Sequence, residues 1–320
     1  MDKVNKALIA VDPSGSYRVY LAVTTKLAED ARQIHRPTAL ATAALGRVLT
    51  GAGIMGLMMK NSGDKLTVQF KGDGPAGEIL ATAYGSGTVK GYISNPDVDL
   101  PLRADGKPDV GGAVGIGALT VIKDLGLKEP YVGRIDLVSG EIADDLTMYF
   151  FLSEQQSSSV ALGVRVDVDC SVKTAGGMVI QMLPGGDPAA VDYLEAAVNK
   201  ISSITAWIES AEEEACSEGK DGEACAERTL ELLLDHIFGE MPEEYRAKFL
   251  EYRDLAWKCD CSEERLEQVL QSLGKKELAA MIEEDGQAEL MCQFCTKKYH
   301  FNRERLENIL VTLCKNKKEK

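Results

Sequence analysis

The sequence predicts an α+β fold in three parts: a domain with a mostly antiparallel sheet and helices, a helical middle segment, and a small C-terminal domain. Three observations support this organisation. Short strand-like segments joined by hairpin-length links run to about residue 185. Apolar residues then recur three to four positions apart within residues 188–234. Two close pairs of cysteines follow, and we place the domain boundaries at 1–185, 186–257 and 258–320.

The first domain opens with a predicted β-hairpin and two helices. Lys6 to Val11 and Tyr17 to Thr24 are typical of strands and flank an Asp-Pro-Ser-Gly-Ser turn. Helices are predicted over Lys26 to His35 and over the apolar stretch Thr38 to Met59, with Pro37 between them. Short segments bounded by Gly or Pro predict further strands at 65–71, 77–84, 88–94, 116–123, 131–139, 159–168 and 172–182, and helical spacing predicts a helix at 141–155.

The middle segment carries most of the negative charge. From Glu209 to Glu244 there are thirteen acidic side chains against Lys220 and Arg228, a net charge of −11. Like charges repel and apolar content is low here, so we expect marginal stability. An acidic loop is predicted from Ser210 to Ala224. One amphipathic helix is predicted before it, with a buried face made by Tyr193, Ala196, Ala197, Ile201, Ile204 and Ile208.

The C-terminal domain is predicted to contain short helices around its cysteines. Aromatic residues between Met241 and Trp257 lead into it, and no strand or helix is assigned to them. Periodic apolar residues predict a helix over Arg265 to Leu273 that Gly274 terminates, and a second helix that starts at Leu278. Asn302 is predicted to cap the N-terminus of a final helix.

Four cysteines in this domain form the strongest chemical motif of the chain. Cys259 and Cys261 form a C-x-C pair, Cys292 and Cys295 form a C-x-x-C pair, and no cysteine lies between the two pairs. Two such pairs can present four sulfurs at tetrahedral corners, which suits a structural Zn²⁺ with sulfur ligands about 2.3 Å away. The alternative is that they are ordinary buried thiols, but both pairs lie in charged, turn-rich sequence.

Composition limits the possible partners. The chain has 320 residues, 45% hydrophobic content and a net charge of −14, which argues against nucleic-acid binding. The N-terminus lacks the pattern of a secretory signal, and the segment Thr38 to Met59 is interrupted by Arg47 and several glycines. We therefore expect a cytoplasmic protein with no membrane partner, whose eight cysteines stay reduced or bind metal.

Other motifs carry little chemistry. Gly72 to Gly77 fits G-x-G-x-x-G, but a strand rather than a helix is predicted after it, so we expect a hairpin turn and no nucleotide site. Gly111 to Gly117 lacks the lysine of a phosphate-binding loop. No catalytic triad or carboxylate pair is recognisable. Of the histidines, His35 and His236 have no companion at ligand spacing, and His300 is a weaker ligand candidate than the four cysteines.

The remaining four cysteines lie outside the two close pairs. Cys170 and Cys314 are expected to be isolated structural thiols. Cys216 and Cys225 lie in the acidic segment, where they could form an auxiliary oxidisable pair. The alternative that we favour from the sequence places them in a solvated loop without a role.

The cysteine segment resembles the zinc-binding redox switch of the 33-kDa chaperonin family, the redox-regulated heat-shock holdases. The resemblance rests on Trp257 to Ser262 and on Cys292 to Cys295 with Tyr299 and Phe301. It extends over essentially the whole chain, because further segments are similar to the substrate-binding part of that family: Gly72-Asp73-Gly74-Pro75, Lys90 to Pro96, Ala118 to Val121, Gly176-Gly177 and Leu183 to Gly185.

This resemblance implies an ATP-independent chaperone that is not an enzyme, is inactive when reduced and zinc-bound, and is active when oxidised. It implies that Cys259, Cys261, Cys292 and Cys295 hold one zinc ion, and that oxidation links Cys259 to Cys261 and Cys292 to Cys295. It further implies homodimerisation on activation and binding of unfolding client proteins by the first domain. Cys216 and Cys225 are not part of the family pattern.

Physical arguments make such a switch workable. The hydrophobic core of the C-terminal domain contributes only about 3 to 5 kcal/mol of stability, because the domain is small. Structural zinc contributes roughly 10 to 16 kcal/mol, so loss of the metal should unfold this domain. Lys258, Lys297 and Lys298 and the N-terminus of the helix near Ser262 favour thiolates. We predict that Cys292 and Cys295 oxidise first. Two alternatives stay open: a thiol-disulfide oxidoreductase, and a zinc-stabilised adaptor whose cysteines never cycle.

Overall fold

The computed structural model describes the backbone of residues 3–316 and the side chains to residue 313. The chain divides into two compact units, Met1–Lys258 and Cys259–Lys320, and each is described by itself. The predicted boundaries of the three functional domains, at residues 185 and 257, do not follow from this division and stay a prediction.

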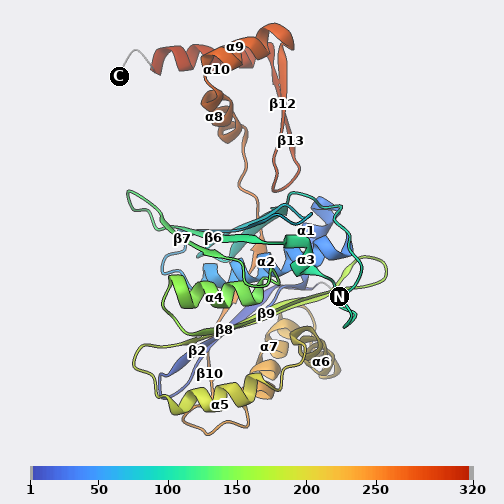
Figure 1. Cartoon of the computed structure of the whole chain (residues 1–320), viewed down its shortest axis with the longest axis vertical. Helices are drawn as coiled ribbons and strands as arrows, with labels where there is room; N and C mark the ends of the chain where they lie inside the picture. Colours follow the sequence, from blue (N-terminus) through green and yellow to red (C-terminus); the bar gives the residue numbers. More distant parts are fainter. Residues whose placement is uncertain (1–2, 317–320) are drawn as a thin grey trace. The chain divides into compact units, whose positions relative to one another are not determined.

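The first unit is built on two mostly antiparallel sheets (Figure 1). Sheet A has the strand order β10-β1-β2-β9-β8 and sheet B has the order β11-β5-β4-β3-β6-β7. The strands of sheet A are β1 (Lys6–Val11), β2 (Tyr17–Val23), β8 (Ser158–Val166), β9 (Val172–Met182) and β10 (Lys248–Asp254). Those of sheet B are β3 (Lys65–Gly72), β4 (Glu78–Tyr84), β5 (Thr88–Ile93), β6 (Gly117–Asp124), β7 (Tyr131–Asp136) and β11 (Ala256–Trp257). The predicted α+β class with antiparallel sheets is confirmed.

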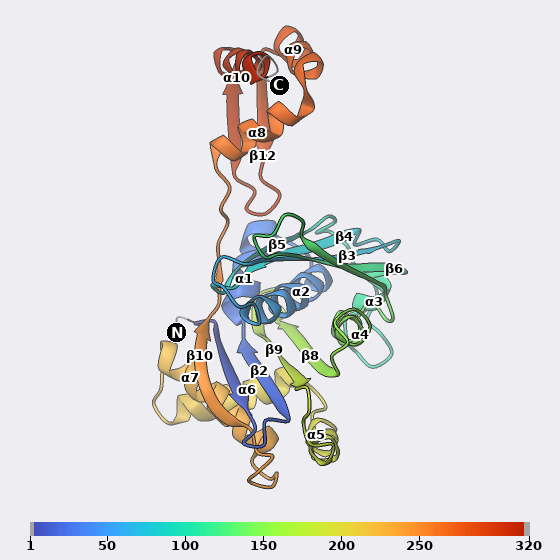
Figure 2. The same cartoon turned by 90° about the vertical axis from the view of Figure 1, so that its left-hand side faces the viewer.

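Helices fill the space between the two sheets (Figure 2). They are α1 (Thr25–His35), α2 (Ala39–Leu57) and α4 (Ala143–Ser153), while the five-residue α3 (Val110–Val114) was not predicted. Helix α2 is long and apolar enough to cross a membrane, but 94% of that stretch is buried, so it is a core helix as predicted. Its glycines allow close packing: a Cβ on Gly51 would lie 2.6 Å from a methyl of Leu146.

The opposite face of sheet A is covered by the middle segment (Figure 2). Three helices form this cover, α5 (Ala189–Val198), α6 (Ile204–Ser217) and α7 (Gly222–Phe238). Their apolar residues and those of β1, β2 and β9 form a second core, which is separate from the core around α2. The helical character of the middle segment is therefore confirmed.

Two details of the middle segment were predicted wrongly. The apolar residues from Tyr193 to Ile208 do not share one helix, because α5 ends at Val198, Ile201 lies in the link, and Ser203 caps a new helix by accepting the amide of Ala206. The expected acidic loop is helical, since α6 runs to Ser217 and α7 starts at Gly222. Ala211 and Ala215 continue the buried stripe of Ile208, so the glutamates between them lie on the outer side of a packed helix.

The segment before the cysteines joins the edges of both sheets, which the sequence analysis missed. Strand β10 pairs antiparallel with β1 in sheet A, and β11 pairs parallel with β5 in sheet B. Leu255, between the two strands, is buried against Gly53 of α2. Trp257 packs edge-on against His35 with ring centroids 6.1 Å apart. This segment therefore supplies an edge strand to each of the two sheets immediately before Cys259.

The second unit contains a β-hairpin and three helices around a small core. The hairpin consists of β12 (Gln287–Met291) and β13 (Lys298–Asn302), and the helices are α8 (Glu263–Leu273), α9 (Lys275–Glu284) and α10 (Arg303–Asn316). All three helices were predicted and the hairpin was not. The predicted cap is present, because Asn302 accepts the amide of Arg305 at 3.0 Å. The core is formed by Leu270, Leu278, Ile282, Cys292, Tyr299, Phe301, Leu306 and Ile309.

Candidate metal centre

The second unit brings the four predicted cysteines together from two segments. Cys259 and Cys261 lie on the stretch between β11 and the N-terminus of α8. Cys292 and Cys295 lie in the turn that joins β12 to β13. That turn is fixed by two hydrogen bonds, from the amide of Thr296 to the carbonyl of Cys292 at 2.8 Å and from the amide of Cys292 to the carbonyl of Lys297 at 2.9 Å.

The four sulfurs have the spacing of a tetrahedral metal site. All of them lie within 4.8 Å of one another. The Sγ atoms of Cys259 and Cys292 are 3.7 Å apart, and those of Cys261 and Cys295 are 3.4 Å apart. Sulfurs bound to zinc at 2.3 Å would lie about 3.8 Å from one another at tetrahedral corners. The cluster therefore fits a single metal ion, and a tetrahedral sulfur set is typical of zinc.

The surroundings of the thiols shift their pKa values in different directions. Burial opposes ionisation of Cys261, but hydrogen bonds with the Tyr299 hydroxyl and neighbouring thiols outweigh it and lower the pKa of Cys261 to about 7. Burial raises the pKa of Cys259 and of Cys295. Backbone amides offset part of this effect, because the amide of Cys261 hydrogen-bonds to Cys259 and the amide of Lys297 to Cys295. Hydrogen bonds of this kind to the sulfur atoms orient thiolate ligands.

Tyr299 is a residue of the site to which sequence reasoning gave no role. Its hydroxyl lies 3.1 Å from the Sγ atom of Cys261 and donates to the carbonyl of Cys261 at 3.2 Å. Its ring is buried in the core of the unit, and the Lys297 ammonium lies 4.8 Å from the ring centroid. Tyr299 therefore connects the cysteine cluster to the core. The alternation of polar and aromatic residues along 298–302 was the available sequence signal for β13, and in the structure these residues are alternately exposed and buried.

Some of the basic side chains expected to favour thiolates at the cluster interact with other residues. Lys298 forms an ion pair with Glu289 across the hairpin, with its Nζ atom 2.7 Å from Oε1. Arg265 donates to the carbonyl of Asp260, between the first two cysteines, at 3.0 Å. Ser262 caps α8 by accepting the amide of Arg265, so the positive end of that helix directly follows Cys261 as predicted.

The three histidines lie outside the cluster of sulfurs. The His300 side chain is 72% exposed and its Nδ1 atom lies 3.4 Å from Glu289, so it is not part of the group of ligand atoms. His35 packs against Trp257, and His236 lies 3.6 Å from Glu214. The G-x-G-x-x-G segment forms the hairpin link from β3 to β4, as predicted.

The other cysteines divide into three cases. Cys170 is exposed, in the turn between β8 and β9. The side chain of Cys314 lies outside the described residues. Cys216 and Cys225 are not in a solvated loop, which corrects the interpretation favoured from the sequence. They lie on α6 and α7 with their Sγ atoms 3.5 Å apart, because the acidic stretch folds into two adjacent helices.

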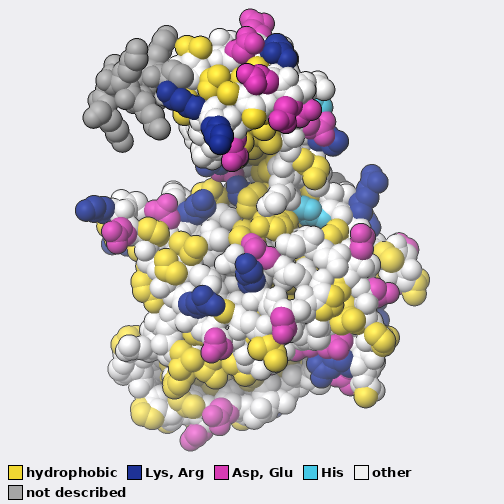
Figure 3. Space-filling model, turned by 45° about the horizontal axis from the view of Figure 1, so that its top comes forward, with side chains coloured by type: hydrophobic (Ala, Val, Ile, Leu, Met, Phe, Trp, Pro, Cys, Tyr) yellow, Lys and Arg dark blue, Asp and Glu magenta, His cyan; other side chains and the backbone are white. Residues whose placement is uncertain are grey.

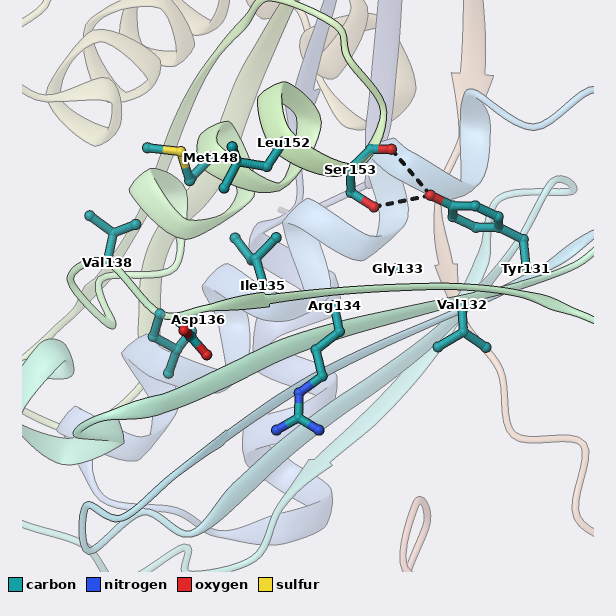
Figure 4. A pocket seen from close by; sticks show the side chains of 11 residues that line it. Tyr131, Val132, Gly133, Arg134, Ile135, Asp136, Val138, Met148, Leu152 and Ser153 are labelled. Carbon is teal, nitrogen blue, oxygen red and sulfur yellow. Dashed lines mark hydrogen bonds between the residues drawn. The ribbon is translucent and has the colours of Figure 1, made fainter.

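A shallow cavity of about 820 Å³ lies between β7 and α4 (Figure 4). Ile135 of the strand and Met148 and Leu152 of the helix give it apolar walls, while Arg134 points to the other side of the strand. Tyr131 hydrogen-bonds to Ser153 at its rim. Its lining residues include no histidine or cysteine.

Comparisons with known proteins agree with the fold and with the cysteine cluster. The family model described as "Hsp33 protein" matches residues 5–302. The 33 kDa chaperonin of Alkaliphilus oremlandii is 45% identical over 95% of this chain and 96% of its own length. That of Clostridioides difficile is 45% identical over 95% and 97%, respectively. The crystal structure of the 33 kDa chaperonin from Thermotoga maritima superposes with a TM-score of 0.80 at 34% identity, covering 98% of this chain and 100% of that one. The chain therefore belongs to the Hsp33 family of 33 kDa chaperonins, which are holdases rather than enzymes and bind client proteins.

Proposed function

We propose that this protein is a redox-regulated, ATP-independent holdase of the cytoplasm. In the reduced state Cys259, Cys261, Cys292 and Cys295 hold one zinc ion and the chaperone is inactive. Oxidation forms the disulfides Cys259–Cys261 and Cys292–Cys295, zinc leaves, the middle segment unfolds, and a homodimer binds unfolding proteins. The observation that carries this proposal is the apolar face of sheet A, which an acidic segment covers immediately before the cysteine cluster.

Zinc at the four cysteines would supply the stability that the second unit lacks. Eight buried side chains form its core among the described residues, which is small for a unit of this length. Bound structural zinc contributes roughly 10 to 16 kcal/mol of apparent free energy at neutral pH. The protein contributes the thiolates, the orienting amides and the Tyr299 hydroxyl. Removal of the ligands by oxidation therefore leaves a unit that cannot stay folded.

The proposed oxidation balances within each pair. Two thiolates lose two electrons and form one S–S bond, and one peroxide molecule is reduced to two hydroxide ions. In the folded cluster the short contacts join sulfurs of different pairs, Cys259 with Cys292 and Cys261 with Cys295. Once the unit opens, only partners close in sequence remain near each other, because long loops are entropically costly to close. This supports the pairing Cys259–Cys261 and Cys292–Cys295.

The covered face of sheet A supplies the client surface. It is lined by Leu8, Ala10, Tyr17, Val19, Leu21, Val23, Met178 and Ile180, all buried beneath the middle segment. Apolar surface of this extent marks an interaction site once it is exposed. Individual apolar side chains are already exposed between charged ones on the face drawn in Figure 3, which gives clients a first contact before the larger surface opens.

Loss of the middle segment would also free a strand edge. β10 is the outer neighbour of β1, so its departure leaves β1 at the edge of sheet A. An unpaired edge strand can add an extended peptide or a second copy of the chain through backbone hydrogen bonds. The same event thus offers a route to client binding and to the homodimer.

The test combines three readouts on one sample. The reduced, zinc-loaded protein is treated with peroxide at heat-shock temperature, and zinc release, free thiols and suppression of client aggregation are followed together. We expect one zinc ion to leave as four thiols disappear and holdase activity to rise. Equal activity in the reduced and oxidised samples would contradict the proposal.

Neither alternative is favoured by the site geometry. Cys292 lies in a β-hairpin turn, whereas thioredoxin-like C-x-x-C motifs lie near a βαβ unit. Insulin reduction would reveal an oxidoreductase, and zinc retention under peroxide would reveal a static adaptor.

A further inference from the structure

A second pair of thiols lies in contact in the middle segment, remote in sequence from the four-cysteine cluster. Cys216 is in the last turn of α6 and Cys225 is in the first turns of α7. Their Sγ atoms are 3.5 Å apart, whereas a disulfide bond is about 2.05 Å long, so a small rotation of the side chains would bring them to bonding distance. Cys225 is buried and Cys216 is half-buried.

The connection between the two helices fixes this contact. Gly219 has a φ of +76° and ends α6, with its amide donating to the carbonyl of Cys216 at 2.9 Å. The amide of Cys225 donates to the carbonyl of Asp221 at 3.1 Å. Arg228 of α7 donates to both carboxylate oxygens of Glu218, each at 2.8 Å. Both cysteines are thus held in register by backbone and ion-pair contacts.

A small cavity gives solvent access to the pair. It measures about 30 Å³ and is lined by both cysteines together with Lys3, Glu212 and Thr229, among others. This volume holds one water-sized molecule beside the two thiols, and the half-buried Cys216 is the thiol more open to an oxidant. Burial, followed by the contact with Cys216, raises the pKa of Cys225 to about 11. Because a thiolate attacks sulfur far faster than a thiol does, a step in which Cys225 is the nucleophile should be slow.

We propose that Cys216 and Cys225 form a second, slowly oxidising disulfide that staples α6 to α7. Peroxide first converts Cys216, the more accessible thiol, to a sulfenic acid and releases water. The Cys225 sulfur then attacks the Cys216 sulfur, forms the S–S bond and expels a second water, so two thiols lose two electrons to one peroxide.

The disulfide has a consequence that rests on the proposed function. It closes a short loop across the α6–α7 connection and removes conformational freedom from the unfolded middle segment. The staple therefore opposes the unfolding that oxidation of the four-cysteine cluster promotes. Moderate oxidation leaves α6 and α7 free to open, whereas prolonged oxidation retains them as a linked helical pair and limits the exposed surface.

The first experiment detects the bond itself. Full-length protein is treated with increasing peroxide, digested without reduction, and analysed by mass spectrometry. We expect a peptide containing the Cys216–Cys225 disulfide to appear after the zinc cysteines have oxidised, and also in the Cys292→Ser variant. Failure to form this bond even after prolonged treatment with peroxide well beyond the level that oxidises all four cluster cysteines would overturn the proposal, whatever the holdase activity.

The second experiment measures how strongly the Cys216–Cys225 disulfide protects α6 and α7 from hydrogen exchange. After prolonged oxidation, hydrogen exchange of residues 204–238 is compared between the wild type, Cys216→Ser and the control Cys170→Ser, which removes an exposed thiol elsewhere. We expect amides of α6 and α7 to exchange about a hundredfold faster in Cys216→Ser than in the other two proteins. Equal exchange in all three would overturn the stapling role. Because both readouts are independent of client binding, they separate this proposal from the proposed holdase function.

Discussion

Sheet A presents its two faces to very different partners. Its inner face packs against α2, whose only charged residue is Arg47 and which is held between two sheets. Its outer face packs against α6 and α7, whose apolar stripes alternate with glutamates and whose other sides face solvent. The two covers bury similar strands but differ in composition. On the proposed function, the α2 side is a permanent cover and the α5–α7 side is a removable one, and the difference in composition is what a chaperone with a hidden client surface would require.

The largest expected effect comes from removing one of the proposed metal ligands in the second unit. Cys292→Ser should abolish tight zinc binding, with a loss of roughly 10 kcal/mol of apparent binding free energy. We expect the second unit to lose its folded signals in NMR spectra while α2 and sheet B keep theirs. Cys170→Ser is the matched control. Retention of one tightly bound zinc ion in Cys292→Ser would mean that the ligand set is wrong.

A matched pair of leucines compares the two covers directly. Leu49 of α2 and Leu233 of α7 are both buried, with 0% and 1% exposure. Leu49→Ala should lower the free energy of global unfolding of the first unit by about 2 to 5 kcal/mol, measured by urea denaturation. Leu233→Ala removes the same atoms, but its cost should appear as faster hydrogen exchange confined to α5–α7. Equal global destabilisation by both variants would show that the covers form one cooperative unit.

A smaller effect is expected from the ion cluster that fastens the removable cover. The Lys6 side chain of β1 is only 6% exposed, and its Nζ atom lies 2.9 Å from Asp254 of β10 and 3.4 Å from Glu227 of α7. Glu223 is a third partner. Lys6→Met should leave these carboxylates to repel one another and weaken docking of the cover by about 1 to 2 kcal/mol, measured by hydrogen exchange of α7.

The control for this change is Lys26→Met, which removes an exposed ion pair to Asp30 within α1. Its expected cost is at most about 0.5 kcal/mol. If both variants cost the same, the Lys6 cluster has no special role in holding the middle segment.

The smallest expected effect is on the folding stability at low pH, and it comes from Glu29 of α1. Hydrogen bonds from Arg32, and further contacts that include the amide of Val172, lower the pKa of Glu29 from 4.5 to about 2. A carboxyl group with a lowered pKa stabilises the fold above its unfolded value and loses this contribution as the pH falls from about 4.5 to 2. Glu29→Gln should therefore remove about 1 kcal/mol of stability at pH 7 and flatten the acid dependence below pH 4.5. An acid profile as steep as that of the wild type would contradict this assignment.

The sequence predicted those parts of the molecule that depend on local pattern. Periodicity located α1, α2, α8 and most strands, and the spacing of the cysteines located the four-cysteine cluster. Strand β10 was missed because Phe249 and Leu250 are exposed and its pairing with β1 is a contact between distant segments. The second half of α6, from Ser210, was mistaken for a loop because alanines, not large apolar residues, form its buried stripe beside the glutamates.

The contact between Cys216 and Cys225 likewise could not be predicted from local sequence pattern. Nine positions separate the two residues, and nothing in that spacing distinguishes a solvated loop from an antiparallel pair of helices. The packing of both helices on one face of sheet A decides the matter. Tyr299 likewise shows a role only when the hairpin brings its hydroxyl to Cys261.

The central claim is that the state of four sulfurs controls the cover on the outer face of sheet A. Hydrogen exchange with simultaneous zinc detection tests it most directly, using the Cys216→Ser variant so that no staple forms. We predict that peroxide releases zinc and that α5–α7 and β10 then lose protection while α2 and sheet B retain it. Full protection of α5–α7 after zinc has left and all four cysteines have oxidised would contradict the account.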